Sequence, residues 1–347
     1  MRKNALLYYR YATRKVVRYY MNSTATAVLL LLTGIASSGI YSVGLGPANR
    51  RCKTLSQLQL FNGCFTVIAM LGALTVAVLQ GDRLYLPLSG ILAAFAFGCL
   101  FSATVFTNLK ALEEGPLSLT TLIVNFSLIM PLAYSFIFLD EAVTLTRVVG
   151  IIMLVICMVL FANPKITGEG KFSVKWLVYS VLALLCNGTL SLISKIYAMH
   201  TDNAYAAPYL IYCYFFAVLV SFLLFFVLDR RQKAEERTKA KAFFTKQMCG
   251  IILLVGAANY LLNFSVVRLA TAMDGAIVYP AIQGGGPIIA ALLSRILFKE
   301  HISLKKAAAI ALGAALSAVL AEHMQGKLLA LALNDQTVDP AALYPHG

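Results

Sequence analysis

The sequence predicts an all-α integral membrane protein with ten transmembrane helices, arranged as two inverted five-helix repeats. Three observations lead to this fold class: the composition, the long uncharged segments and an internal repeat. Of the 347 residues, 60% are hydrophobic and 13% are charged, and the mean hydropathy is +0.78. Soluble proteins carry about 25% charged residues. The composition therefore excludes most soluble enzymes, disordered chains and secreted disulfide scaffolds.

The uncharged segments have the length that a membrane-spanning helix needs, which is about 20 residues for a hydrocarbon core of roughly 30 Å. Most connections between them are short, so consecutive helices are expected to be antiparallel neighbours. No stretch remains for a separate soluble domain. The ten predicted spans lie near 24–46, 57–80, 85–107, 115–138, 144–163, 174–197, 208–228, 248–267, 275–297 and 304–322.

The two ends of the chain differ from the spans. Residues 1–23 alternate basic residues with tyrosines, a pattern typical either of a helix in the lipid headgroup region or of a basic flank of the first span. Residues 323–347 form a polar tail. The net charge of +14 resides in loops and ends, which favours contact with the lipid bilayer over nucleic acid. The total distribution of basic residues favours termini outside the cell, whereas the basic flank of the first span favours termini inside.

An internal repeat divides the chain. The segment that begins at Glu141 and the segment that begins at Glu300 share the pattern Glu, any residue, β-branched, hydroxyl, Leu, any residue, basic, 159 residues apart. The first span, from Ala36, also resembles the sixth, from Leu185, at a separation of 149. Two further pairs recur at a separation of 158, Lys110 with Arg268 and Asn125 with Gln283.

The repeat predicts a first five-helix repeat over 24–163, a linker over 164–173 and a second five-helix repeat over 174–322. Because each half has an odd number of spans, the second half enters the bilayer inverted relative to the first. Inverted repeats are the frame of many secondary transporters, with the substrate site near the midplane between the halves.

The repeated glutamates are interpreted as structural. Glu141 and Glu300 each begin a predicted helix and are followed three residues later by a hydroxyl residue. A carboxylate at the positive end of a helix dipole stabilises the helix by about 0.3–1 kcal/mol. This capping role is favoured over a proton or substrate site.

Taken together, these segments resemble the drug/metabolite transporter superfamily, specifically its EamA-type members. The resemblance covers about 24–322 and implies a central cavity lined by spans 1, 3, 4, 6, 8 and 9. It also implies transport of amino acids, metabolites, nucleotide sugars or drugs. The chain departs from the family at Gly46, where a lysine often closes the first span. The segments that carry the resemblance are Lys110 through Glu141 and Gly150, Asn187-Gly188 followed by Lys195, and Arg268 through Glu300.

Polar residues inside the spans are the candidates for substrate binding, because polar groups in hydrocarbon are costly unless they are paired or face an aqueous cavity. The alternative for each is a hydrogen bond between helices, worth roughly 1 kcal/mol or less. The candidates are Ser38, Tyr41, Ser102, Asn125, Asn187, Ser191, Asn259, Asn263, Tyr279 and Gln283.

The ninth span contains a cluster of prolines and glycines that predicts either a hinge or close helix packing. Proline removes a helical hydrogen bond and glycine relaxes the backbone, so the helix is expected to kink or open there. Small residues equally allow a neighbouring helix to approach. The hinge candidates are Pro280, Gly284, Gly285, Gly286 and Pro287.

Charge is kept out of the predicted spans, and no Asp or Glu lies deep in any of them. This disfavours proton-coupled efflux of organic cations through a buried acid. It favours facilitated diffusion or exchange of a neutral or zwitterionic solute such as an amino acid. Lys195 and Arg268 lie near span ends, where snorkelling to headgroups is favoured over attraction of an anionic group. The scattered cysteines and histidines form no ligand spacing, so no metal site and no cofactor are expected.

The tenth span carries a small residue at every fourth position, which lets another helix approach closely. Two partners fit this stripe: a second copy of the chain, giving a homodimer, or the fifth span of the same chain. The stripe consists of Ala309, Gly313, Ser317 and Ala321.

The function that these patterns favour is a secondary transporter that moves a small organic solute across the plasma (inner) membrane by alternating access. The chain is not expected to be an enzyme, because an enzyme site needs clusters of His, Asp or Cys near the interface. Two alternatives remain open: a membrane-embedded lipid-modifying enzyme and a non-transporting membrane scaffold.

Overall fold

A computed structural model describes residues 2–82, 84–114, 120, 123–138, 152, 156, 173–201, 205–232 and 240–298. Within these ranges the chain folds into helices joined by turns, and no described residue belongs to a strand. The elements are α1 (Arg2–Arg51), α2 (Leu55–Gln80), α3 (Leu88–Glu114), the 3-10 helix η1 (Phe126–Leu128), α5 (Ile129–Phe138), α7 (Val174–His200), α8 (Ala206–Arg230), α9 (Ala240–Phe243), α10 (Lys246–Ala272) and α11 (Gly275–Phe298).

Six stretches of described helix are long and apolar enough to cross a membrane, and they fit a multi-pass membrane protein. Each falls on a span that the sequence predicts. A shorter apolar helix, Ile123–Phe138, occupies the described part of the predicted span 115–138. The six stretches are Ala25–Ala48, Leu55–Gln80, Leu88–Asn108, Val174–His200, Ala206–Arg230 and Lys246–Ala272.

Several predictions fall outside the described residues. These are the fifth and tenth spans apart from residues 152 and 156, the two repeated glutamates, nearly all of the 164–173 linker, the 323–347 tail and the small-residue stripe of the tenth span. The ten-helix count, the homodimer contact and the capping role of the glutamates therefore stay predictions.

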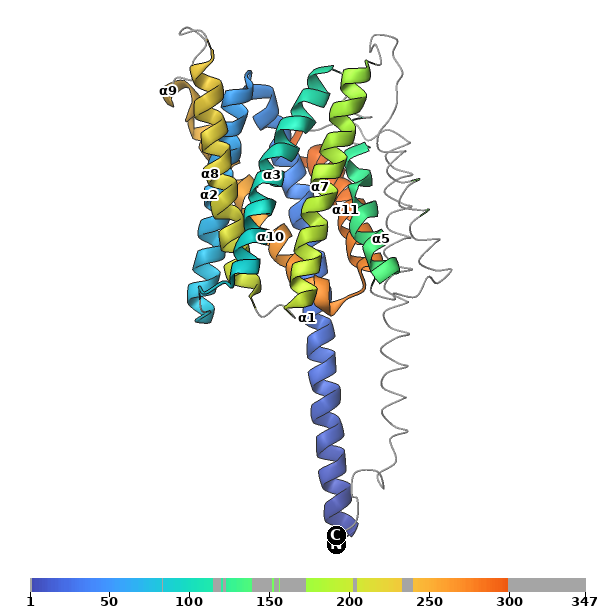
Figure 1. The fold of residues 1–347 in the computed structure, drawn as a ribbon. Helices are drawn as coiled ribbons and strands as arrows, with labels where there is room; N and C mark the ends of the chain where they lie inside the picture. The colour runs from blue at the N-terminus through green and yellow to red at the C-terminus, as the bar shows by residue number, and fades with distance from the viewer. Residues whose placement is uncertain are drawn as a thin grey trace.

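The basic N-terminal segment is the first part of α1. The helix runs without interruption from Arg2 to Arg51, and its first residues continue the axis of the first span beyond the end of the bundle (Figure 1). The segment thus extends away from the bundle as a continuation of the span.

Side chains that precede the helices explain where three of them begin. The hydroxyls of Thr54, Ser173 and Thr245 accept hydrogen bonds from the backbone N–H groups three residues later, at 3.0–3.3 Å. Such N-caps satisfy donors that the first helical turn leaves free. At the other end of α2, Gly81 adopts a left-handed φ of 69°, which glycine accommodates without strain.

The described helices of the bundle run in two opposite directions. In Figure 1, α1, α3, α8 and α11 run upward, and α2, α5, α7 and α10 run downward. α1 packs against α10 and α11, whereas α7 packs against α3 and α5. α2 packs against α8 and α10, whereas α8 packs against α2 and α3.

Glycines set the closest helix crossings. A Cβ on Gly98 of α3 would lie 2.6 Å from Phe216 Cβ of α8, and one on Gly256 of α10 would lie 2.5 Å from the carbonyl oxygen of Phe65 in α2. The two glycines are 158 residues apart. Neither crossing has room for a larger side chain.

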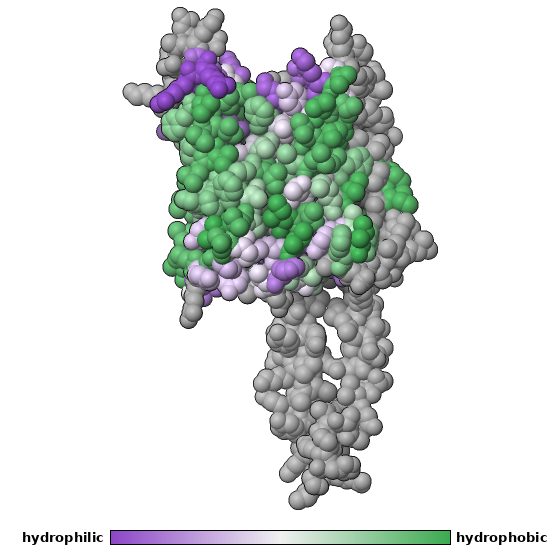
Figure 2. All heavy atoms as spheres, viewed as in Figure 1, coloured by the Kyte–Doolittle hydropathy of each residue, from purple (hydrophilic) through white to green (hydrophobic). Residues whose placement is uncertain are grey.

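The outside of the bundle is apolar. Large hydrophobic side chains point outward, among them Leu79 at 80% and Leu88 at 70% exposure. Figure 2 shows apolar residues over the flank of the bundle, between more polar residues at its upper and lower edges. This distribution suits a surface that contacts lipid tails at its flank and headgroups at its edges.

Candidate functional site

A cavity of about 300 Å³ lies inside the bundle, between helices from both parts of the chain. Its wall combines amides and hydroxyls with aliphatic and aromatic side chains. The lining residues are Ser38, Tyr41, Ser42 and Leu45 of α1; Leu58, Phe61, Asn62 and Phe65 of α2; Phe101, Thr104, Val105 and Asn108 of α3; Val124 and Asn125; Asn187, Leu190, Ser191 and Ser194 of α7; Asn259, Leu262, Asn263, Val266 and Val267 of α10; and Tyr279, Ile282 and Gln283 of α11.

None of these described lining residues is a charged amino acid. The polar capacity comes from seven carboxamides, five aliphatic hydroxyls and two phenols among them. Amides and hydroxyls both donate and accept hydrogen bonds. The cavity can therefore bind polar groups through neutral hydrogen bonds.

The lining repeats between the two parts of the chain. All four lining positions of α1 recur 149 residues later in α7, and all four of α3 recur 158 residues later in α10. Val124 and Asn125 recur 158 residues later as Ile282 and Gln283. The positions are repeated, but the residue types are not. Each polar lining residue of α3 has an apolar residue at the paired position of α10, and each apolar lining residue of α3 has a polar one. The paired positions are Ser38 with Asn187, Tyr41 with Leu190, Ser42 with Ser191, Leu45 with Ser194, Phe101 with Asn259, Thr104 with Leu262, Val105 with Asn263, and Asn108 with Val266.

Two equivalent glycines bring α1 and α7 close to the helices beside them. A Cβ on Gly39 would lie 2.5 Å from Ile289 Cγ2, and one on Gly188 would lie 2.9 Å from Met130 Cγ. Gly39 and Gly188 are 149 residues apart, whereas Met130 and Ile289 are 159 apart. Each glycine thus permits a close contact with a neighbouring helix.

Nine of the ten sequence-predicted binding residues line this cavity together: Ser38, Tyr41, Asn125, Asn187, Ser191, Asn259, Asn263, Tyr279 and Gln283. Ser102 does not line it. Its side chain is fully buried, and its Oγ lies 3.0 Å from Ser221 Oγ of α8. Ser102 therefore has the alternative role named above, a hydrogen bond between two helices. Periodicity could not separate the two roles, because Ser102 is one position beyond Phe101, which does line the cavity.

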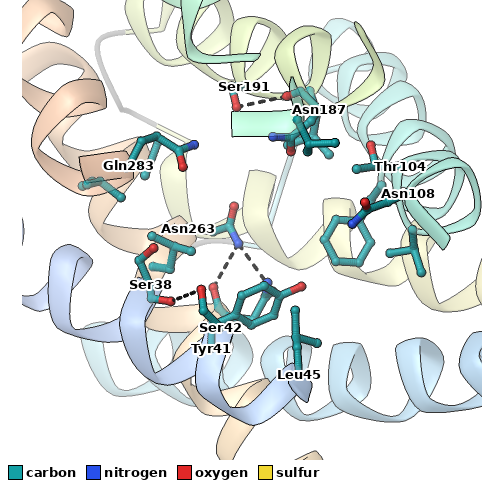
Figure 3. Close-up of a pocket in the computed structure, with 18 of the residues that line it drawn as sticks. Ser38, Tyr41, Ser42, Leu45, Thr104, Asn108, Asn187, Ser191, Asn263 and Gln283 are labelled. Atoms are coloured by element: carbon teal, nitrogen blue, oxygen red, sulfur yellow. Dashed lines mark hydrogen bonds between the residues drawn. The ribbon is translucent and has the colours of Figure 1, made fainter. Parts of the chain in front are cut away.

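Hydrogen bonds hold several of the lining side chains in place (Figure 3). Asn263 Nδ2 donates to the carbonyl oxygen of Asn259 at 2.9 Å, and Ser191 Oγ donates to the carbonyl oxygen of Asn187 at 3.2 Å. Asn187 Nδ2 donates to Ser127 Oγ of η1 at 2.7 Å. This last bond joins α7 to the wall of the cavity beside Asn125. The side-chain amides of Asn187 and Asn263 are therefore held in fixed orientations.

Lys195 is buried, which overturns the prediction that its side chain snorkels to the headgroups. It is 1% exposed, and its Nζ donates a hydrogen bond to Ser135 Oγ of α5. The ammonium also lies 5.6 Å from the centre of the Tyr279 ring, and Tyr279 lines the cavity. The ammonium thus lies between Ser135 of α5 and the Tyr279 ring of α11. The position of Lys195 near the end of a predicted span did not indicate that its side chain is buried.

The predicted hinge residues lie in a helix that is continuous over its described length, with Pro280 and Pro287 inside it. A Cβ on Gly285 would lie 2.6 Å from Ile35 Cγ2, and one on Gly286 would lie 2.9 Å from Ser38 Cβ. These two glycines permit the close approach of α1. The packing interpretation thus has direct support, and the hinge stays a prediction.

The sequence did not single out several polar residues of the cavity wall. Asn62, Ser42, Asn108 and Ser194 all line it. The internal repeat contained a usable signal for one of them, because Ser42 lies 149 residues before the predicted Ser191. Ser194 and Asn108 have the apolar counterparts Leu45 and Val266, and Asn62 has no counterpart in the cavity lining.

Comparison with known proteins shows a similarity of fold only. No protein family model and no curated protein matches the sequence. A solved structure described as "Crystal structure of protein" superposes on this chain with a TM-score of 0.64 and 14% sequence identity, covering 85% of this chain and 97% of that chain. At this identity the similarity is one of fold: the chain shares a helical architecture with a protein of nearly matching extent.

Proposed function

We propose that the protein is a secondary transporter of a small organic solute, built from ten membrane-spanning helices in two inverted five-helix repeats. The observation that carries the proposal is the pairing of the cavity wall between the two parts of the chain. Ten lining positions before the linker recur after it at separations of 149 or 158 residues. An enzyme site has no need of such paired walls.

The helix arrangement supports the inverted repeat. α1, α2, α3 and α5 correspond in order to α7, α8, α10 and α11, and each pair is antiparallel in Figure 1. The contacts of α1 with α10 and α11 correspond to those of α7 with α3 and α5. The fifth and tenth helices complete the two halves in this proposal. The resemblance to EamA-type transporters agrees with the same division.

Paired walls provide a route to alternating access. In an inverted repeat, two halves that exchange conformations open the same cavity first to one side of the membrane and then to the other. The close glycine contacts of α1 with α11, and of α7 with η1 and α5, give these helices smooth surfaces for such a movement. The solute is held by amides that stay attached to helices throughout.

The cavity favours a small, neutral or zwitterionic solute, such as an amino acid. Its volume of about 300 Å³ is at the lower end of the range of roughly 300–1,000 Å³ that ligand pockets occupy. Its described wall has no charged side chain, so a solute with net charge would lose its hydration without gaining a counter-ion. Location in the plasma (inner) membrane stays a prediction.

Flux into proteoliposomes tests this function. A panel of labelled solutes is chosen from a toxicity screen of cells that overexpress the protein. At least one solute should enter faster than it enters empty vesicles, and Asn263→Ala and Gln283→Ala should each lower that flux about tenfold. Such a decrease corresponds to about 1.4 kcal/mol of lost binding.

Thr75→Ala is the matched control. Thr75 Oγ1 bonds to the carbonyl oxygen of Leu71 on the exposed side of α2, and the residue does not line the cavity. This variant should transport like the wild type. The proposal is wrong if no solute moves above the rate of empty vesicles, or if the two cavity variants both keep the wild-type flux.

A further inference from the structure

One amide in the wall of the cavity presents a fixed hydrogen-bond acceptor. The NH₂ group of Asn263 in α10 donates to two oxygens of Asn259, the backbone carbonyl oxygen at 2.9 Å and the side-chain Oδ1 at 3.4 Å. A backbone carbonyl oxygen can only accept, so the NH₂ group must face Asn259, and Oδ1 of Asn263 lies on the other side of the amide. Figure 3 shows this oxygen pointing away from the dashed bonds of the NH₂ group and into the cavity.

A second amide in the same wall is free at both of its polar atoms. Gln283 of α11 lines the cavity and forms no hydrogen bond within the part of the chain that the structure describes. Its side chain extends into the cavity in Figure 3. Asn263 and Gln283 are both only partly buried, and their free atoms are not among the described side-chain atoms that are both unpaired and sealed from solvent. A solute in the cavity can therefore reach both amides.

The two amides lie on helices that pack against each other. Leu262 and Val266 of α10 belong to one apolar cluster with Ile282 of α11. Asn263 follows Leu262 in the chain, and Gln283 follows Ile282. Figure 3 shows the Gln283 amide and the Asn263 oxygen in the same part of the cavity. One small solute can therefore bond to both.

We propose that Gln283 and Asn263 form a subsite for an uncharged primary carboxamide, which the solute carries. This inference rests on the proposed function and names the chemical class of its solute. The planar carboxamide of Gln283 offers a donor and an acceptor side by side, and the solute's carboxamide pairs with this edge through its own carbonyl oxygen and one N–H. Its second N–H donates to Asn263 Oδ1. The three bonds thus use both hydrogens of the solute's NH₂ group.

Other small polar groups match these atoms less well. A carboxylate has no hydrogen for Asn263 Oδ1 or for the oxygen of Gln283, and an ammonium has no acceptor for the Gln283 NH₂ group. A solute with either net charge would also meet a described wall without a counter-ion, which is costly. A hydroxyl group has one hydrogen, so it can donate to only one of the two oxygens.

Three compounds that share a pyridine ring test the subsite: nicotinamide, 3-acetylpyridine and nicotinate. In 3-acetylpyridine a methyl group replaces the NH₂ group, so the shape and the carbonyl acceptor are kept and both donors are lost. Nicotinate carries a negative charge. A flat ring suits the aromatic part of the wall, where Tyr41 and Phe65 make an edge contact with ring centres 6.0 Å apart.

Binding of the three compounds to the purified full-length protein in detergent is measured by titration calorimetry. Nicotinamide should bind about tenfold or more tightly than either of the others, because both leave the oxygens of Gln283 and Asn263 without a donor. In Gln283→Met, which keeps the length of the side chain and removes its hydrogen-bonding edge, the preference over 3-acetylpyridine should fall to about threefold, the effect of one remaining neutral hydrogen bond.

Gln283→Met is expected to fold, because Gln283 has no hydrogen bond to lose within the described residues. Asn263→Leu removes the other acceptor and should also lower the preference, and the double variant should abolish it. Gln59→Met is the matched control. It makes the same substitution at a fully buried glutamine that lies outside the cavity lining, and it should keep the full preference.

The proposal is overturned if 3-acetylpyridine binds as tightly as nicotinamide, if nicotinamide does not bind, or if Gln283→Met keeps the full preference. Its failure is separable from that of the transport function. Selective binding of nicotinamide without flux of any solute would contradict transport and leave the subsite standing. Flux restricted to solutes without a carboxamide would contradict the subsite and leave transport standing.

Discussion

Replacing Gly39 by alanine tests the close contact between α1 and α11, on which the shape of the cavity depends. The new methyl group would lie 2.5 Å from Ile289 Cγ2, 2.6 Å from Ile289 Cβ and 3.0 Å from the carbonyl oxygen of Gly286. Carbon atoms in contact are ordinarily about 3.5–4.0 Å apart. The substitution therefore places one carbon roughly 1 Å too close to two others.

A change of rotamer cannot remove this clash, because the Cβ of Ile289 is fixed by its backbone. The two helices must separate instead, and overpacking of this kind costs about 1–3 kcal/mol. The higher helix propensity of alanine offsets up to about 1 kcal/mol of this cost. We expect Gly39→Ala to lower the free energy of unfolding by about 1–2 kcal/mol.

Gly46→Ala provides a matched comparison on the same helix. A Cβ at Gly46 has no atom within 4 Å, so only the propensity gain remains, and the variant should be as stable as the wild type or slightly more stable. The free energies of unfolding can be measured by titrating the purified protein from mild detergent into sodium dodecyl sulfate and following the loss of helical circular dichroism.

The comparison removes the general effect of a glycine-to-alanine change and isolates the packing at Gly39. Equal stability of the two variants, within about 0.5 kcal/mol, would refute the close contact and with it the position of α11 beside α1. Gly188→Ala, 149 residues further along the chain, should also be destabilised, since its Cβ would lie 2.9 Å from the carbonyl oxygen of Ser127.

Three other predictions concern single side chains. Ser135→Ala removes the hydroxyl that accepts from buried Lys195 and should destabilise the protein by about 1–3 kcal/mol in the same unfolding titration; wild-type stability would contradict the buried position of the ammonium. Burial raises the pKa of Cys52 to about 12, so its thiolate is scarce below that pH. In a variant that retains only this cysteine, alkylation should accelerate about tenfold per pH unit from pH 8 to 11, and a plateau near pH 9 would count against burial. Trp176 Nε1 donates to Thr120 Oγ1 at 2.8 Å; because Trp176 is the single tryptophan, Thr120→Val should shift the fluorescence emission to shorter wavelength, and an unchanged spectrum would exclude this bond.

The sequence could anticipate features that are linear along the chain. Hydropathy is summed over neighbouring residues, so six predicted spans coincide with long apolar helices, and their ends differ from the prediction by only a few residues apart from the extended α1 and α3. The register of the repeat is linear as well. The separations of 149 and 158 residues, noted first at Ala36 and Asn125, also relate the paired positions of the cavity wall.

The sequence could not predict contacts between side chains of different helices, because these contacts depend on how the helices pack. Lys195 and Ser135 are 60 residues apart, and only the packing of α7 on α5 makes the lysine a buried residue. Ser102 lies one position beyond Phe101 of the cavity wall, but its hydroxyl forms a hydrogen bond with Ser221 of α8 instead.

By itself, then, the sequence determined a helical chain suited to a membrane, together with the numerical register that relates its two parts. The tertiary structure decided which polar groups are paired between helices and which, like the amide of Gln283, have no partner among the described residues of the cavity wall. The physical reason is that hydropathy and spacing belong to one helix at a time. A hydrogen bond or a cavity requires side chains from several helices to meet, and that meeting is set by packing.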